Sequence, residues 1–408
     1  MSEAVSIVLV GLGGYGEVYL GGLLDEQGRP TQRLVGAVDP EPERCGRLEE
    51  LRARRVPVYA TLEEFYRQQR ADLAVISSPI HQHGPQTCLA LHHGSYVLCE
   101  KPAAATVQEV AEMAAAADRS GRWVAIGYQW SYSRAIQELK RDVIAGVFGR
   151  ARRWRTLCLW PRDEAYYGRN DWAGRKSDGR GHWVLDSPVN NAMAHDLHNA
   201  LYVLGSRVEA SARPVRVTAE LYRANDIENC DTAAVRVETA EGAEILFYGS
   251  HAVADVQDPI FCGEFERAYV TFEGGSSPIV AELEDGTRRE YGSPDDTPQT
   301  QKLWDCVAAV AGGAAPCCQL AAAGAQTLSV NGAQDSAGEP AVFPAAMVRE
   351  RVPGAARLVW VEGLAEALRK CYDEAALPAE LGLSWARGGT AVDLNGYVCY
   401  PGGVSGRA

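Results

Sequence analysis

One segment near the start of the chain constrains the fold more than any other. Residues 5–10 form an apolar run typical of a buried strand, Gly11-Leu12-Gly13-Gly14-Tyr15-Gly16 follows directly, and a helical pattern continues to residue 24. Gly11 allows a tight turn, and Gly16 allows the helix to pack closely on the strand. A strand, a Gly-x-Gly-x-x-Gly turn and a helix in this order form the first half of a βαβ unit. The segment therefore predicts an α/β domain with a parallel sheet.

The same turn predicts a dinucleotide cofactor. Gly13 lets a pyrophosphate approach the backbone, and the N-terminus of the following helix attracts its negative charge. The second strand, residues 34–38, ends in Asp39, where an acidic residue binds adenosine ribose hydroxyls and repels a 2′-phosphate. We therefore expect NAD, with NADP less favoured, although Arg44 lies nearby. The alternatives are a turn without a ligand and an Asp39 that only caps the next turn.

Strands and helices alternate through the first part of the chain. Buried strand patterns at residues 73–77, 96–99 and 123–127 are separated by helical patterns. This alternation is typical of a doubly wound parallel sheet, because each crossover helix covers one face of the sheet. We therefore expect an α/β Rossmann domain over residues 1–127.

The pattern changes at Tyr128 to long segments of alternating polarity. They are joined by hairpin signals such as Asp285-Gly286, which indicates antiparallel pairing. We expect an α+β domain over residues 128–387 with a large open, mainly antiparallel sheet. A glycine-rich tail over residues 388–408 is expected to be mobile.

A charged pair and a proline follow the strand at residues 96–99. Pro102 cannot continue the strand and restricts the residue before it, so Lys101 is expected at the carboxyl end of the strand. Ligands bind at this edge of open α/β sheets. A ligand that shields a lysine from water can lower the pKa of the lysine enough for proton exchange near neutral pH. Glu100-Lys101-Pro102 is also a common surface turn, and its position in the alternating pattern favours the catalytic interpretation.

A second candidate group opens the helix predicted around residues 190–204. One helical face is expected to carry Asn191, His195, His198 and Tyr202, and the opposite face is apolar. We predict that the polar face lines a substrate pocket in which His195 transfers a proton. A solvated face is the alternative, but such a face would usually carry Lys and Glu. A metal needs further ligands that the sequence does not place, so no metal is predicted.

Residues beside these motifs complete the predicted sites. The catalytic residues are Lys101, His195 and Asn191. The cofactor site is predicted to contain the glycine turn with Asp39, Ser77, Ser78, Pro79, His83, Glu100, Lys101 and Gln129. The substrate site is predicted to contain Tyr128, Trp130, Trp160, Arg162, Trp172, Asn191 and His198. Aromatic faces stack on sugar rings and arginine forks bind anions, but ordinary packing is an equal alternative for the aromatic and basic residues.

Composition narrows the classes of partner and location. The net charge of −13 argues against a general nucleic-acid or anionic-membrane binder. No apolar run of about 18 residues could span a membrane, and the N-terminus lacks a signal-peptide pattern. The 11 cysteines, an odd number without Cys-x-x-Cys pairs, indicate a reducing, cytoplasmic setting. A long open sheet needs covering, so we expect a homodimer or homotetramer through the C-terminal sheet.

Five separated elements together resemble one family. They are the glycine turn at residues 11–16, Asp39, Ser78-Pro79-x-x-x-His83, Glu100-Lys101-Pro102 and the helix that bears His195. In this order they are similar to the glucose-fructose oxidoreductase/inositol dehydrogenase/rhizopine catabolism (Gfo/Idh/MocA) family over most of the chain. The resemblance implies a Rossmann domain, a C-terminal domain whose open sheet often forms the oligomer interface, and NAD(P)-dependent redox chemistry on a secondary alcohol of a sugar or cyclitol.

The resemblance also implies roles and shows departures. Lys101 would hydrogen-bond the reacting hydroxyl, and His195 would be the acid/base histidine. Asn191 and His198 stand where the family usually has aspartates. Either Lys101 and His195 carry the proton transfer alone, or His195 lacks its usual electrostatic partner. Three functions stay open: an NAD-dependent oxidoreductase, a redox-neutral enzyme that uses bound NAD to cleave or eliminate a glycosidic bond, and a non-catalytic protein that binds NAD and a sugar.

Overall fold

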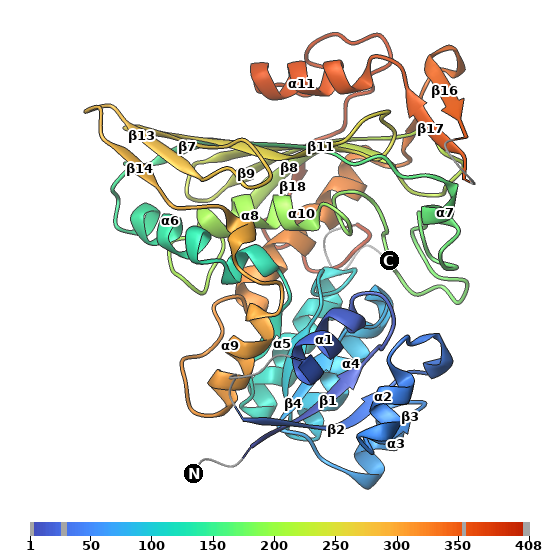
Figure 1. Cartoon of the computed structure of the whole chain (residues 1–408). Coiled ribbons are helices and arrows are strands. Elements are labelled where there is room, and N and C mark those ends of the chain that lie inside the picture. Colours follow the sequence, from blue (N-terminus) through green and yellow to red (C-terminus); the bar gives the residue numbers. More distant parts are fainter. Residues whose placement is uncertain (1–3, 26–30, 353–355, 403–408) are drawn as a thin grey trace. The chain divides into compact units, whose positions relative to one another are not determined.

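The chain forms two units, each with its own sheet and core (Figure 1). The computed structural model describes residues 4–25, 31–352 and 356–402. The first unit comprises residues 1–104, 108–132 and 297–323, and the second comprises residues 105–107, 133–296 and 324–408. The predicted boundary at residue 127 lies close to an observed one. The prediction of contiguous domains is wrong, however, because residues 297–323 return to the first unit.

The first unit contains the predicted doubly wound sheet. Six parallel strands lie in the order β3-β2-β1-β4-β5-β6. The strands are β1 (Val5–Val10), β2 (Gln32–Val38), β3 (Val58–Tyr59), β4 (Leu73–Ile76), β5 (Tyr96–Cys99) and β6 (Val124–Ile126). The order reverses between β1 and β4, and in open α/β sheets ligands bind at such a point.

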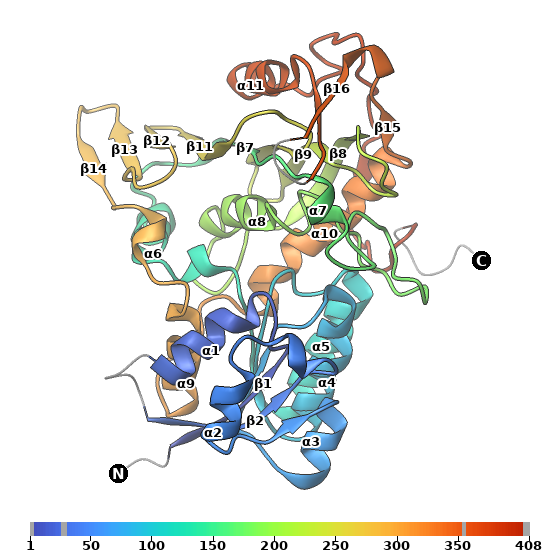
Figure 2. The ribbon, with the colours of Figure 1, turned by 45° about the vertical axis from the view of Figure 1, so that its right-hand side comes forward.

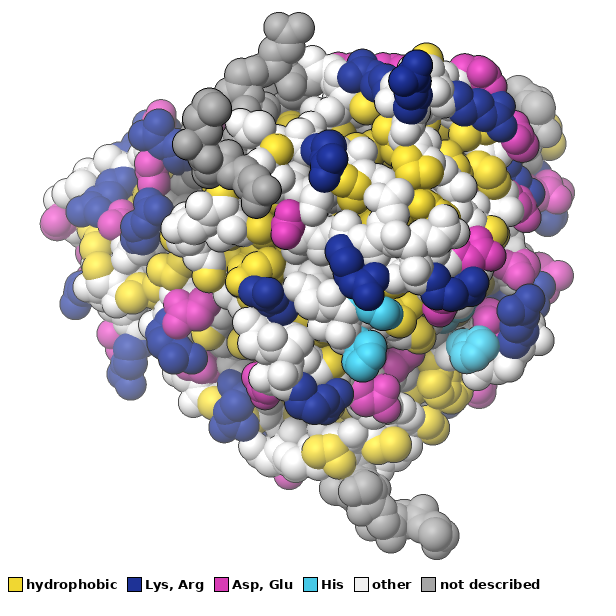
Figure 3. Space-filling model, turned by 90° about the horizontal axis from the view of Figure 1, so that it is seen from below, with side chains coloured by type: hydrophobic (Ala, Val, Ile, Leu, Met, Phe, Trp, Pro, Cys, Tyr) yellow, Lys and Arg dark blue, Asp and Glu magenta, His cyan; other side chains and the backbone are white. Residues whose placement is uncertain are grey.

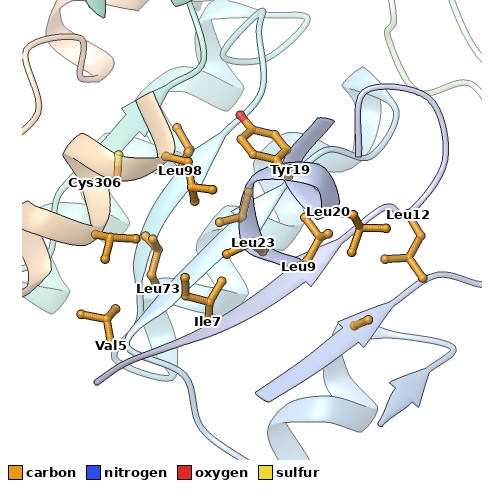
Figure 4. Packing of buried hydrophobic residues seen from close by; sticks show 14 of the residues in the cluster. Val5, Ile7, Leu9, Leu12, Tyr19, Leu20, Leu23, Leu73, Leu98 and Cys306 are labelled. Carbon is orange, nitrogen blue, oxygen red and sulfur yellow. The ribbon is translucent and has the colours of Figure 1, made fainter. Parts of the chain in front are cut away.

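Helices cover both faces of this sheet. They are α1 (Gly16–Asp25), α2 (Leu48–Ala53), α3 (Leu62–Gln68), α4 (Ile80–His92), α5 (Val107–Ser120) and α9 (Gln301–Val310), with short 3₁₀ turns η1 (Pro42–Arg44) and η2 (Gln129–Tyr132). Figure 4 shows Tyr19, Leu20 and Leu23 of α1 against Ile7 and Leu9 of β1.

Helix α9 explains why the chain returns to the first unit. Leu303, Cys306 and Val307 are fully buried in the same apolar cluster as β1 and α1, and Figure 4 shows Cys306 close to Leu98 of β5. Removing this apolar surface from water stabilises the docked helix. Sequence periodicity predicts such a helix but does not say which distant core it joins.

The second unit contains the predicted large sheet, which is mainly antiparallel. Its strands run in the order β14-β13-β12-β11-β7-β10-β9-β8-β15, with β18 on β8. Among the described strands of this sheet, only the β7/β10 and β8/β15 pairs are parallel. The strands are β7 (Ala151–Leu159), β8 (Pro214–Arg223), β9 (Thr232–Thr239), β10 (Glu244–Ser250), β11 (Gln257–Phe265), β12 (Ala268–Phe272), β13 (Val280–Leu283), β14 (Arg288–Glu290), β15 (Ala341–Val342) and β18 (Val392–Asp393).

Helices of the same chain cover both faces of the middle of this sheet. Figures 1 and 2 show α8 and α10 on one face and α11 on the other. The remaining elements of the unit are α6 (Arg134–Ile144), α7 (Glu164–Tyr167), α8 (Ala194–Val203), η3 (Pro294–Asp296), α10 (Leu320–Ala337), η4 (Ala345–Met347), β16 (Val348–Arg351), β17 (Leu358–Val361) and α11 (Leu364–Glu374).

Helix α11 covers a face of the large sheet that the sequence analysis expected a partner subunit to cover. Leu364, Leu368 and Cys371 are fully buried and belong to one apolar cluster with Leu157 of β7 and Leu246 of β10. The C-terminal part of the chain therefore covers the middle of its own sheet. Tyr269 of β12 remains 57% exposed towards the far end.

The described part of the predicted tail, residues 388–402, makes defined contacts with β8 and α10. Strand β18 pairs with β8, and the Tyr397 hydroxyl donates to Asp335 Oδ2 at 2.6 Å. Gly389 packs so closely that a Cβ there would lie 2.0 Å from the Ala219 carbonyl oxygen. The glycines thus allow close approach of backbones. Residues 403–408 of the predicted tail lie outside the described residues.

The surface shows basic and acidic side chains interspersed over one face of the molecule (Figure 3). Neither sign of charge dominates the face that is visible there. Among the described residues, no helix is long and apolar enough to cross a membrane.

Candidate functional site

The glycine turn between β1 and α1 has the shape that a pyrophosphate needs. A Cβ on Gly11 would lie 2.5 Å from the Ser77 carbonyl oxygen, and one on Gly16 would lie 2.1 Å from the Gly11 carbonyl oxygen. A Cβ on Gly13 would meet nothing within 4 Å. Two glycines are therefore required for close packing, while the third leaves its backbone open to a ligand. Helix α1 begins at Gly16, so the positive end of its dipole lies beside this space.

Asp39 is fixed at the edge of the glycine turn. Its Oδ2 accepts a hydrogen bond from the Leu12 N–H at 2.8 Å, and its Oδ1 accepts one from the Glu41 N–H at 2.8 Å. One oxygen thus caps the turn after β2, and the other holds the glycine turn. Asp39 also borders a hollow of about 370 Å³ that Arg52 and Tyr59 help to line. Each carboxylate oxygen can accept a further hydrogen bond, such as one from a ribose hydroxyl.

A buried ion pair supports the Glu100-Lys101-Pro102 motif. Glu100 Oε1 lies 2.5 Å from Lys302 Nζ of α9 and accepts a hydrogen bond from the Tyr19 hydroxyl at 2.6 Å. The Lys302 and Glu100 side chains are 1% and 8% exposed. Burial alone would raise the pKa of Glu100, but Lys302 and the Tyr19 hydrogen bond outweigh it and lower that pKa. Lys302 also donates to the Gly127 carbonyl oxygen at 3.0 Å.

The network reaches the glycine turn through Tyr15. Lys302 Nζ lies 4.2 Å from the centre of the Tyr15 ring, close enough for a cation–π interaction. The Tyr15 hydroxyl lies 3.4 Å from Gln129 Oε1, to which it donates. The first unit thus brings together three predicted cofactor-site residues, namely Tyr15, Glu100 and Gln129, around Lys302. Sequence reasoning missed Lys302, although a single lysine among apolar residues of a predicted helix was a usable signal.

Lys101 lies directly after β5, at the predicted carboxyl edge of the sheet. Its backbone N–H donates to Glu100 Oε2 at 3.2 Å, so the buried carboxylate holds the backbone that carries the lysine. The Lys101–Pro102 peptide bond is cis.

His83 joins two of the predicted cofactor loops. Its Nδ1 lies 2.8 Å from the Pro102 carbonyl oxygen, and its Nε2 lies 2.9 Å from the Ser78 carbonyl oxygen. The side chain is buried, and burial lowers its pKa. Both ring nitrogens face backbone groups, so this geometry supports an indirect role in which His83 holds the loops together.

In the second unit, Asn191 precedes the helix instead of lying on its polar face. Helix α8 begins at Ala194, and residues 190–193 form a turn. Asn191 Nδ2 donates to Asp186 Oδ1 at 2.6 Å. Asp186 is 2% exposed, and its Oδ2 accepts from the Gly174 N–H at 2.6 Å. A buried carboxylate therefore stands beside the asparagine that replaces the aspartate of the family pattern.

His195 and His198 have different surroundings. His195 is partly exposed in the first turn of α8. His198 is 1% exposed and stacks on Tyr202, with ring centroids 5.6 Å apart. Burial lowers the pKa of His198 well below its usual value. His198 thus has a packing position, because α8 is buried on nearly every side, and its contact with substrate stays a prediction.

Three predicted substrate residues, Trp160, Arg162 and Trp172, belong to a series of cation–π contacts on the segment after β7. Arg162 Cζ lies 5.1 Å from the centre of the Tyr166 ring and 5.8 Å from that of Trp160. Arg169 Cζ lies 3.7 Å from the Tyr166 ring and 5.2 Å from the Trp172 ring. Arg169 also lies 3.6 Å from Asp186. This cluster therefore extends to the segment that carries Asn191 and His195. Tyr128 and Trp130, also predicted here, are buried residues of the first unit.

Comparison with known proteins identifies both halves of the chain. A family description, oxidoreductase family with NAD-binding Rossmann fold, matches residues 5–128, and the GFO/IDH/MocA C-terminal domain matches residues 136–276. The chain belongs to the Gfo/Idh/MocA family. Its first unit is accordingly an NAD-binding Rossmann domain, and the glycine turn fits that cofactor.

Individual relatives of this Gfo/Idh/MocA protein align over part of their length. An inositol 2-dehydrogenase of Rubrobacter xylanophilus is 27% identical over 51% of this chain and 54% of its own. A D-glucoside 3-dehydrogenase of Escherichia coli is 29% identical over 33% of this chain and 36% of its own. A 2,7-anhydro-N-acetylneuraminate hydratase of Mediterraneibacter gnavus is 27% identical over 36% of this chain and 38% of its own. The chain thus spans about a third to a half of these relatives.

Solved structures share the fold over most of the chain. The WlbA dehydrogenase from Bordetella pertussis, solved with NADH and UDP-GlcNAcA, has a TM-score of 0.65 and 20% identity, and the match covers 81% of this chain and 95% of that one. A levoglucosan dehydrogenase, solved with NADH and levoglucosan, has a TM-score of 0.66 and 16% identity over 81% of this chain and 97% of that one. Within the described residues, no group of three or more His, Cys, Asp or Glu could hold a metal ion.

Proposed function

We propose that this protein is an NAD-dependent oxidoreductase that interconverts a secondary alcohol and a ketone on a sugar, cyclitol or sugar derivative. Its relatives include dehydrogenases of inositol and of D-glucosides. The observation that carries the proposal is the support of Lys101. A lysine that follows β5 directly is tied, through its own N–H, to a carboxylate held by Tyr19 and Lys302. Such support keeps a proton-transfer group in place.

The residues divide the work as follows. The glycine turn and Asp39 bind the cofactor, which supplies the site that accepts or returns a hydride. Lys101 hydrogen-bonds the reacting oxygen and takes its proton as the carbonyl forms, and His195 is the second acid/base group of the proposed reaction. Asn191 has no carboxylate and can only orient a hydroxyl.

Variants of Lys101 test this proposal. Lys101→Ala should lower kcat by about a hundredfold or more, because general acid–base catalysis contributes about 10²–10⁴-fold. NADH binding, followed by fluorescence, should change little, because the glycine turn and Asp39 are intact. His195→Asn should lower kcat less if the histidine orients the oxygen. Unchanged turnover in Lys101→Ala would contradict the proposal.

A second candidate is a redox-neutral reaction that uses the same cofactor catalytically. The hydratase among the relatives favours it. In that case a substrate would be eliminated, hydrated or cleaved at full rate without net formation of NADH. Product analysis by mass spectrometry, with NADH measured in the same sample, separates the two reactions.

A further inference from the structure

A buried histidine of the second unit has one ring nitrogen that no described residue satisfies. His251 is 2% exposed, and its Nδ1 lies 2.8 Å from the Trp160 carbonyl oxygen. A carbonyl oxygen only accepts, so Nδ1 carries the hydrogen. Burial lowers the pKa of His251 to about 3, and the positive charges of Arg162 and Arg169 act in the same direction. The ring is therefore neutral near pH 7, and Nε2 is a bare acceptor without a partner among the described residues.

The same place gathers positive charge around Tyr166. The Tyr166 ring lies 5.5 Å from the His251 ring and has Arg169 and Arg162 at 3.7 and 5.1 Å. Burial raises the pKa of Tyr166 to about 12, so its hydroxyl stays neutral. The Tyr166 ring thus contacts both guanidinium groups and also lies beside His251, whose Nε2 is the unsatisfied acceptor.

Acidic groups nearby do not balance both arginines. Asp186 lies 3.6 Å from Arg169, but it also accepts hydrogen bonds from Gly174 and Asn191. Asp163 caps α7 by accepting from the Tyr166 N–H at 3.0 Å. In the described part of the chain, no carboxylate oxygen lies within 4.0 Å of a nitrogen of Arg162. Arg162 Nη1 donates to the Pro161 carbonyl oxygen at 3.1 Å, but this partner is neutral, so the positive charge of Arg162 is left to attract an anion.

We propose that Arg162, Arg169 and His251 form a subsite for a polyhydroxylated acid, in which the arginines bind an anionic group of the substrate and His251 Nε2 accepts a hydrogen bond from a hydroxyl. This inference rests on the proposed function for the sugar-like nature of the substrate. A ligand hydroxyl would satisfy the buried Nε2, which is otherwise costly to leave unpaired. The anion is a carboxylate or a phosphate, since a guanidinium fork binds both. The cluster is joined to the segment of Asn191 through Asp186.

Binding measurements on the full chain test the subsite without requiring turnover. Calorimetry with NADH present would compare D-glucuronate with D-glucose and D-galacturonate with D-galactose, with glucose 6-phosphate as the phosphate probe. The wild type should bind at least one acidic probe about tenfold more tightly than its neutral counterpart. Arg162→Gln should remove this preference, Arg162→Lys should keep part of it, and the exposed control Arg180→Gln should keep all of it. His251→Phe should weaken acidic and neutral probes alike, because it removes a hydroxyl acceptor.

The outcomes separate this inference from the proposed function. Equal binding of acidic and neutral probes, no binding of any acidic probe, or a preference that survives Arg162→Gln would overturn the subsite. A preference for glucose 6-phosphate that depends on Arg162 would support it with phosphate as the anion. An acidic probe that binds through Arg162 yet yields no NADH and no other product would leave the subsite standing and count against the proposed function.

Discussion

Removing the lysine beneath Glu100 should destabilise the first unit strongly. In Lys302→Met the Glu100 carboxylate stays buried but loses its cation, while the Tyr19 hydrogen bond remains. Breaking a buried pair by removing one partner costs about 3–5 kcal/mol. Since Tyr19 still satisfies part of the carboxylate, we expect a loss of about 3 kcal/mol. Glu100→Gln in the same chain should recover part of it, because the remaining group is neutral.

The pH dependence of this loss has a definite sign. Lys302 and Tyr19 hold the pKa of Glu100 below its usual value. The pair therefore stabilises the fold above the unfolded-state pKa of about 4.3, and this contribution disappears as the pH falls through the folded-state pKa. The difference in stability between wild type and Lys302→Met should accordingly be largest near neutral pH and smaller in acid.

Urea unfolding followed by tryptophan fluorescence measures these effects. The control is Lys370→Met, which removes an exposed pair with Glu374 whose side chains are 56% and 52% exposed. Exposed pairs contribute about 0–1 kcal/mol, so this control should unfold almost as the wild type does. A Lys302→Met loss no larger than that of Lys370→Met would refute the reasoning about the buried pair.

Three further predictions follow from single contacts. Asp39→Ala should weaken NADH binding about tenfold in a fluorescence titration, because it frees the Leu12 N–H and removes a ribose acceptor; unchanged affinity would contradict this. Asn191→Asp should lower the free energy of unfolding, because it places a second carboxylate beside Asp186. The two carboxylates repel each other and raise the pKa of the pair, so the loss of stability should grow as the pH rises through that pKa. Urea unfolding at several pH values measures this loss, and a stabilised variant would argue against it. We propose that the expected homodimer or homotetramer uses the β12 end of the sheet, so Tyr269→Asp should yield monomers in light scattering; a monomeric wild type would refute this.

The sequence was sufficient to place residues whose position depends on a local pattern. The glycine turn, Asp39 and Lys101 lie where strand ends and turn residues predict them, and the parallel sheet follows from the alternation of strands and helices. These features are set by neighbouring residues and by backbone geometry. The family assignment, which rests on their order, is confirmed.

The sequence was insufficient where distant segments meet. Helix α9 packs in the first unit, and α11 packs on the sheet of the second unit. The periodicity of each helix predicts an apolar face but does not say which apolar surface that face packs against. The pattern around His198 predicted a helix with one polar face. Because α8 is buried on nearly every side, the order of polar and apolar residues does not show what each side chain contacts. Lys302, Asp186 and His251 acquire their partners only through folding.

The most direct test of the account is NADH formation by the purified wild type with NAD, followed by absorbance, across inositols, free sugars, uronates and sugar phosphates. Lys101→Ala runs beside it, with NADH binding of both proteins checked by fluorescence. We predict stoichiometric NADH formation with one class of substrate, and its loss in Lys101→Ala. Absence of NADH with every substrate, from a protein shown to bind the cofactor, would contradict the proposed oxidoreductase.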